Sequence, residues 1–232
     1  MDRELSRCEA GNPSPAAPSC VKVQAARQPL LLTTRIASMN AESSNRFPGT
    51  AYIDPTARIY GSVEIGEAAS LWPYAVIRAE SKFVQVGRYT NLQDHVMLHV
   101  GYQAPTIVGE FCSITHRVVL HGCTIGDNCL IGIGATIMEG VVIGENSIVA
   151  GHSFVADNTI IPPNSVVMGT PAKVVRTINS FVGNRVNAML YHRNATAYAR
   201  GDHRAWDGPE YEAESRRWKS EAESEFAARY GP

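Results

Sequence analysis

Aliphatic residues recur at every sixth position along most of the chain. Counted from Ile53, the series holds for nineteen positions, interrupted by two longer steps and one shorter step. Glycine often follows the aliphatic residue, as in Ile65-Gly66 and Ile143-Gly144. This period is typical of a β-helix, in which each six-residue unit forms one short strand and turn and three units close one coil. The positions are 53, 59, 65, 71, 77, 86, 92, 98, 108, 114, 120, 125, 131, 137, 143, 149, 155, 161 and 167.

The repeat predicts an all-β main domain over residues 51–176, and it is similar to the left-handed parallel β-helix of hexapeptide proteins. The handedness rests on that resemblance, because crossover connections are otherwise right-handed. Residues 177–232 are expected to form a C-terminal α-helix and a charged tail. In "INSFVGNRVNAMLYHRNATAYAR" apolar residues recur at the three- and four-residue spacing of an amphipathic helix. The tail after it is either a solvated extension or a contact arm between subunits.

Residues 1–50 have a different composition, and we expect them to form a disordered or targeting-like extension. "EAGNPSPAAPSC" is rich in proline, alanine and serine, and "VKVQAARQPLLLTTRIAS" is basic without acidic residues. Two interpretations stay open: a transit peptide for a mitochondrion or plastid, or an over-called start with Met39 as the true initiator. Without a transit peptide the expected location is cytoplasmic.

Charge and cysteine content exclude several classes of function. A formal net charge of −1 provides no basic surface for nucleic acid, and no apolar run approaches the length of a membrane span. The five cysteines are an odd number without a CxxC pair, so a secreted disulfide framework is not expected. Cys112 and Cys129 fall at equivalent places on adjacent coils, which predicts a pair of buried thiols.

Three histidines lie in apolar sequence: His99, His116 and His121. Units three apart stack on the same face of a triangular coil, about 4.8 Å from one another. His99 and His121 then stack directly, with Arg78 in the same column one coil earlier. His116 falls on a different face, above Asp94. One chain should therefore not bring all three imidazoles to one metal, whereas a neighbouring copy in a threefold ring can supply the third.

The same residues carry a resemblance to the γ-class carbonic anhydrases and carbonic anhydrase-like proteins. The matching motifs are "VIRAE", "TNLQDHVMLH", "ITHRVVLHGCTIGDNCLIGIGATIMEG" and "GTPAKVVR". The resemblance implies a homotrimer that hydrates CO₂ reversibly to bicarbonate, with Zn²⁺, or alternatively Fe²⁺ or Co²⁺, at each subunit interface. It implies His99, His116 and His121 as metal ligands and a metal-bound hydroxide as the nucleophile.

The resemblance also implies roles for residues around the metal. Gln93 would orient the hydroxide or bicarbonate, or simply bond a turn amide. Arg78 and Asp94 would support the ligands or form an intersubunit salt bridge. Tyr191 resembles a tyrosine that the family's C-terminal helix points toward the site; it could equally serve packing. The chain departs from the family in two places. Glu80, a candidate catalytic residue, replaces an aspartate of the Arg-Gly-Asp pattern. The acidic loop with a glutamate proton shuttle is missing after His99.

Two alternatives to carbonic anhydrase remain open at this stage. One is a coenzyme A-linked acyltransferase or thioesterase of the hexapeptide type, which would need no metal triad. The other is a catalytically weak trimeric scaffold that keeps the metal site. Tight, stoichiometric metal would argue against the first alternative, and measured CO₂ hydration would separate the second from an enzyme.

Overall fold

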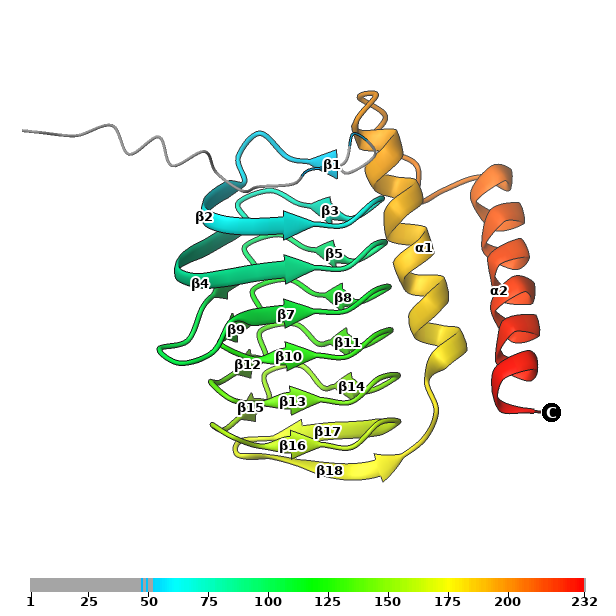
Figure 1. Ribbon diagram of the computed structural model, residues 1–232. Helices are drawn as coiled ribbons and strands as arrows, with labels where there is room; N and C mark the ends of the chain where they lie inside the picture. Colours follow the sequence, from blue (N-terminus) through cyan, green and yellow to red (C-terminus); the bar gives the residue numbers. More distant parts are fainter. Residues whose placement is uncertain (1–46, 48, 50–51, 232) are drawn as a thin grey trace, which may run out of the picture. The chain divides into compact units, whose positions relative to one another are not determined.

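The structure is a computed structural model that describes Phe47, Gly49 and residues 52–231, all within one compact unit. Short strands stack into successive coils (Figure 1). The strand pairing gives three columns of strands, one for each side of a triangular coil. One sheet contains, in spatial order, β1 (Tyr52–Ile53), β3 (Ser70–Leu71), β5 (Asn91–Leu92), β8 (Ser113–Ile114), β11 (Leu130–Ile131), β14 (Ile148–Val149), β17 (Ser165–Gly169) and β18 (Ala172–Thr177).

The second sheet folds around the other two sides of the triangle, because the long strand β4 (Val76–Val86) turns the corner between them. The first half of β4 pairs with β6 and the second half with β7. In order, this sheet contains β15 (Phe154–Val155), β12 (Thr136–Ile137), β9 (Val119–His121), β6 (Met97–His99), β4, β7 (Thr106–Val108), β10 (Thr124–Ile125), β13 (Val142–Ile143) and β16 (Ile160–Ile161), and β2 (Arg58–Ile65) pairs with β4.

The period-six residues form the core inside the coils. All nineteen are buried except Ile53 and Ile59, which pack against the core at its end. Burying an isoleucine or leucine side chain stabilises the fold by about 1.5–3 kcal/mol, so each coil contributes several such increments. The β-helix predicted from the repeat is therefore confirmed, as is a C-terminal α-helix.

A column of small polar side chains runs through the same sheet as β5 and β8. The Thr90 hydroxyl donates to the carbonyl of Gly109 and accepts the backbone N–H of Cys112. One coil later, the backbone N–H of Cys129 donates to the Cys112 sulfur. Both cysteines are buried free thiols, as predicted. The Cys112 contact, together with burial, raises the pKa of Cys129, so the Cys129 thiol stays protonated at neutral pH.

Two helices follow the β-helix. α1 (Phe181–Tyr198) runs along the stacked coils, and α2 (Pro209–Tyr230) lies beside it on the side away from them (Figure 1). The amide nitrogen of Asn184 donates to the carbonyls of Asn128 and Ser147, which fixes the start of α1 against two successive coils.

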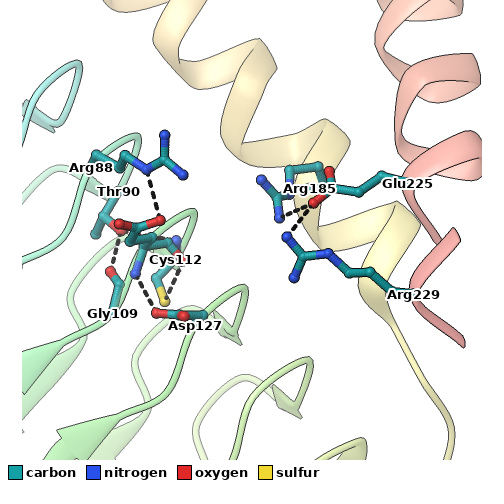
Figure 2. A network of polar contacts seen from close by, with 9 residues as sticks. Arg88, Thr90, Gly109, Cys112, Asp127, Arg185, Glu225 and Arg229 are labelled. Atoms are coloured by element: carbon teal, nitrogen blue, oxygen red, sulfur yellow. Dashed lines mark hydrogen bonds and ion pairs between the residues drawn. The ribbon is translucent and has the colours of Figure 1, made fainter.

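The charged tail packs against its own chain. Figure 2 shows Glu225 of α2 between Arg185 of α1 and Arg229, with distances of 3.3 and 2.6 Å. The Arg185 guanidinium carbon also lies 3.5 Å from the centre of the Phe111 ring on the coils. The tail is thus a second helix that covers α1.

β4 contains an irregularity that matters for the site. Gly61 of β2 pairs with Ala79, but the next residue, Ser62, pairs with Phe83. Glu80, Ser81 and Lys82 therefore have no register partner in β2. Gly61 has φ +83°, and a Cβ there would lie 2.0 Å from the carbonyl oxygen of Ala79, so only glycine fits. Such bulges re-aim side chains, here Glu80.

The extension expected over residues 1–50 lies outside the described residues apart from Phe47 and Gly49. Within the part of the chain that the structure describes, no helix has the length and apolarity needed to cross a membrane.

Candidate metal centre

His99 and His121 lie side by side at the ends of β6 and β9. They are direct register partners, and their ring centres are 5.2 Å apart. Arg78 is the register partner of His99 on β4. This confirms the predicted stacking of Arg78, His99 and His121 in one column. The two imidazoles thus form a pair of nitrogen groups of the kind that bind metals, on one face of the β-helix.

His116 lies on the turn between β8 and β9, two residues after Ile114, which is the register partner of Leu92. Its Nδ1 is 3.0 Å from Oδ2 of Asp94, which occupies the equivalent place one coil earlier. An ionised carboxylate only accepts hydrogen bonds, so Nδ1 of His116 is the donor in this contact, and in the neutral imidazole Nε2 then presents a lone pair. A carboxylate behind the imidazole is a common arrangement for histidines that ligate metals.

No group of three His, Cys, Asp or Glu side chains among the described residues of one chain could hold a metal ion. His121 nevertheless has an unsatisfied atom, because its buried Nδ1 lacks a hydrogen-bond partner in the described part of the protein. Leaving such an atom unpaired costs about 1–3 kcal/mol. The paired imidazoles and the oriented His116 have the donor chemistry that Zn²⁺ prefers, so these residues fit a metal only if a second copy brings its own donors.

Glu80 connects Arg78 to His99. Its Oε1 lies 2.6 Å from Nη1 of Arg78, and its Oε2 lies 3.2 Å from Nε2 of His99. The pKa of Glu80 is lowered, mainly by a hydrogen bond from its own backbone N–H and further by the charges of Arg78 and His99, while desolvation opposes the change. Arg78 does not pair with Asp94 within the chain, since each has another partner. Whether the two meet between subunits stays a hypothesis.

Gln93 is buried in the sheet that carries β5. Its side-chain nitrogen donates to Oδ1 of Asn91 at 2.9 Å. This bond uses the amide nitrogen and leaves the amide oxygen as an acceptor. The suggested role in orienting water stays a prediction.

Tyr191 of α1 packs edge-on against Trp72 and Trp206, with ring centres 5.7 and 5.2 Å away. Burial, and after it the charge of Asp94, raise the pKa of Tyr191 to about 12. The hydroxyl is therefore protonated at neutral pH and can donate but not act as a base. Its catalytic role also stays a prediction.

Glu139 is a neighbour of the site that the sequence interpretation missed. Its Oε1 accepts the backbone N–H of Gln103 at 2.6 Å, in the loop that follows β6. This bond, followed by further ones from the loop, lowers the pKa of Glu139, and the charge of His121 adds to the effect. Stacking the units would have placed Glu139 directly after the His121 column. Glu139 therefore fixes the loop in which the family's shuttle residue is missing.

The face that carries His99 and His121 also presents apolar side chains outward. Val76, Met97, Val119, Thr136 and Phe154 occupy one column on β4, β6, β9, β12 and β15, each only partly buried, and Thr136 is the polar residue among them. A mostly apolar column beside a pair of histidines is suited to contact with another protein surface.

Comparison with known proteins identifies the family. The bacterial transferase hexapeptide family, described by six repeats, matches residues 122–157. Gamma carbonic anhydrase 1, mitochondrial, of Arabidopsis thaliana is 42% identical over 92 residues, which are 37% of this chain and 34% of that protein. A protein of Methanocaldococcus jannaschii named "Probable carbonic anhydrase" is 50% identical over 137 residues, covering 58% of this chain and 86% of that protein. The chain belongs to the γ-class carbonic anhydrase-like family of hexapeptide proteins.

Solved structures place this family member within a wider group of β-helices. A hexapeptide transferase family protein from Anaplasma phagocytophilum is 33% identical, with a TM-score of 0.61, and the match covers 69% of this chain and 94% of that one. The shared fold thus supports both carbonic anhydrase-like and transferase-like proteins, and the side chains on it must decide between them.

Proposed function

We propose that the protein is a metal-dependent carbonic anhydrase that converts CO₂ and water reversibly to bicarbonate. The observation that carries this proposal is the His99–His121 pair, together with a His116 that Asp94 orients from one coil earlier. These residues occur in a chain that is 50% identical, over 137 residues, to the Methanocaldococcus jannaschii protein named probable carbonic anhydrase. Acyl transfer has no need for a paired set of imidazoles and an oriented third one.

The proposed assembly is a homotrimer in which each metal lies between two subunits. Three features support it. The imidazoles of one chain lie on different faces, His121 has a buried unpaired nitrogen, and the His99 face carries the partly exposed column Val76, Met97, Val119, Thr136 and Phe154. In a ring with heterologous contacts, the face with His99 and His121 meets the turn that carries His116 on the next copy.

The proposed metal is Zn²⁺, with Fe²⁺ or Co²⁺ as alternatives. When bound, such an ion acts as a Lewis acid and lowers the pKa of its water to about 7. Asp94 accepts the hydrogen bond from Nδ1 of His116. The lone pair of Nε2 is then available to bind the metal. Arg78 holds Glu80 beside His99.

Two side chains would act on the substrates. The amide oxygen of Gln93 can accept a hydrogen bond and orient a water molecule, because the amide nitrogen is engaged by Asn91. The protonated Tyr191 hydroxyl, near the charge of Asp94, can donate a hydrogen bond to bicarbonate. Proton release to solvent would be slow if no residue of the loop after β6 replaces the family's shuttle glutamate.

A coenzyme A-linked acyltransferase or thioesterase is the second candidate, since the Anaplasma structure is described as a hexapeptide transferase family protein. A metal-bearing scaffold with little activity is the third. Glu80 and the loop after β6, where the chain departs from the family pattern, are compatible with low activity. For the location, relatives from plant mitochondria make an organelle one proposal and the cytoplasm the other.

The decisive experiment combines metal analysis of anaerobically purified protein with stopped-flow CO₂ hydration. We expect one metal per chain and hydration that is lost in His116→Ala. His203→Ala, which removes an exposed histidine of the tail, is the matched control and should behave like wild type. Metal-free protein with acyl transfer activity would support the second candidate, and stoichiometric metal without hydration would support the third.

A further inference from the structure

One buried hydroxyl joins the ends of the two strands that carry the paired histidines. Thr106 is the first residue of β7, and its side chain is fully buried. Its Oγ1 donates a hydrogen bond of 2.6 Å to the carbonyl oxygen of His99 and accepts one of 2.9 Å from the backbone N–H of Gly122. Gly122 directly follows His121 in the chain. The hydroxyl therefore bridges the main chain of His99 and the peptide bond that follows His121.

The two backbones approach each other closely at this point. The nitrogen of Gly122 also lies 3.0 Å from the carbonyl oxygen of His99, so its N–H is shared between that carbonyl and the Thr106 hydroxyl. Gly122 has φ +58°, and a Cβ there would lie 2.6 Å from the Cα of Gly101, so only glycine fits. A triangle of hydrogen bonds thus holds the two peptide bonds together, with the hydroxyl as its third corner.

This triangle controls how the two imidazoles are placed. Each of the two peptide bonds adjoins the Cα of a histidine, so fixing the peptide bonds fixes the direction in which each side chain leaves the main chain. The rings of His99 and His121 have their centres 5.2 Å apart. Two nitrogens that bind zinc at about 2.1 Å in tetrahedral geometry are about 3.4 Å apart. A binding site tolerates deviations of only about 0.5 Å from such geometry, so the support of the pair matters.

We propose that Thr106 is a positioning residue of the candidate metal centre, and that its hydroxyl holds His99 and His121 at the separation at which both can bind one ion. This inference rests on the proposed function. Thr106 touches neither metal nor substrate and acts through the main chain of the two histidines. Its loss should weaken metal binding less than the loss of a histidine, by about tenfold, at the low end of the range for residues that support ligands.

The chain offers a matched control for this hydroxyl. Thr106→Val removes the hydroxyl at nearly constant side-chain size, and Thr106→Ser keeps it. Thr90 is equally buried, and its hydroxyl also donates to a carbonyl, that of Gly109 at 2.7 Å, and accepts a backbone N–H, that of Cys112 at 2.9 Å (Figure 2). Thr90→Val therefore measures the effect of losing such a hydroxyl away from the histidines.

Hydrogen exchange in the metal-free, full-length protein tests the bridge without zinc. The backbone N–H of Gly122 should exchange faster in Thr106→Val than in wild type, because it loses one of its two acceptors, and Thr106→Ser should restore the wild-type rate. In Thr90→Val the exchange at Gly122 should not change. Unchanged exchange at Gly122 in Thr106→Val would show that the hydroxyl does not hold the strand ends and would overturn the proposal.

Competition for Zn²⁺ between the full-length protein and a chromophoric chelator tests the role in metal binding, and urea unfolding shows that each variant is folded. We expect Thr106→Val to bind zinc about tenfold more weakly than wild type, and Thr106→Ser and Thr90→Val to bind it like wild type. If Thr106→Val binds zinc as tightly as Thr90→Val, the proposal is wrong and the proposed carbonic anhydrase stays intact. Wild-type protein that binds no zinc would overturn both.

Discussion

The side of the β-helix beneath α1 and α2 is completed by the chain itself. Phe181 and Trp218 are almost fully buried there, and Arg185 is only 13% exposed between aromatic rings and Glu225. The face with His99 and His121 is different. Arg78 is 44% exposed, the column from Val76 to Phe154 is partly exposed, and His121 has an unpaired buried nitrogen. The difference shows that the chain covers one side by itself, and it supports the proposal that another copy and a metal complete the histidine face.

The largest expected effect concerns the histidine face. His99→Ala, His116→Ala and His121→Ala should each lower metal affinity by more than about 100-fold, because each removes a ligand rather than its support. Metal content after gel filtration measures this. If a variant keeps its full metal content, the replaced histidine is not a metal ligand, and the contrast between the two sides is weaker.

On the covered side, Phe181→Ala should lower the free energy of unfolding by about 3–5 kcal/mol, since a buried aromatic leaves a cavity. Phe181 packs against Phe226 and Tyr230 and lies beneath Arg185 and Arg229. Urea unfolding gives the loss. Folded variant protein should still bind one metal per chain, and a parallel loss of metal would show that the two sides are coupled.

A smaller effect should follow from restoring the family pattern on the histidine face. Replacing Ala79-Glu80 with Gly-Asp should raise kcat/KM for CO₂ hydration by roughly tenfold, which corresponds to about 1.4 kcal/mol in the barrier. The shorter carboxylate would withdraw from His99 Nε2. If hydration and metal content are both unchanged, Glu80 does not limit the activity. The cause would then be the loop after β6, or the protein acts on another substrate.

The smallest effect concerns Tyr191 of α1, on the covered side. A tyrosine ionises near pH 10 when unfolded and Tyr191 at about 12 when folded, so its share of stability is complete below pH 10 and is lost as the pH rises through about 12. Between pH 8 and pH 11, Tyr191→Phe should therefore lose less stability than wild type in urea. Tyr52, whose pKa is also raised to about 12, contributes to the pH dependence of stability in both proteins, so the variant keeps part of it. Equal losses would contradict the assigned burial.

Much of the fold follows from the sequence because one period controls it. The spacing of six places Ile65, Leu98 and Val155 inside the coil, and counting units brings His99 beside His121 and His116 above Asp94. These predictions succeed because the residues share one repeat and lie in register. The family resemblance added the roles of these residues, which spacing alone does not provide.

Other contacts depend on features that break the repeat. The contact of Glu80 with His99 requires a bulge in β4, which the six-residue period does not contain. The packing of α2 on α1 was also not predictable, because only Trp218 and Ala222 of that charged helix are buried. Glu139 was missed for another reason: its contact is with a loop backbone, at Gln103, and not with a neighbouring side chain.

The most direct test of the shared metal site uses mixed trimers refolded from His116→Ala and His121→Ala chains. A site then forms only where a chain that retains His99 and His121 meets one that retains His116. With random mixing in equal amounts this holds at about one quarter of the interfaces, so metal content should recover to about one quarter of the wild-type value. No more metal in the mixture than in the separate variants, with subunit exchange confirmed, would contradict a site shared between subunits.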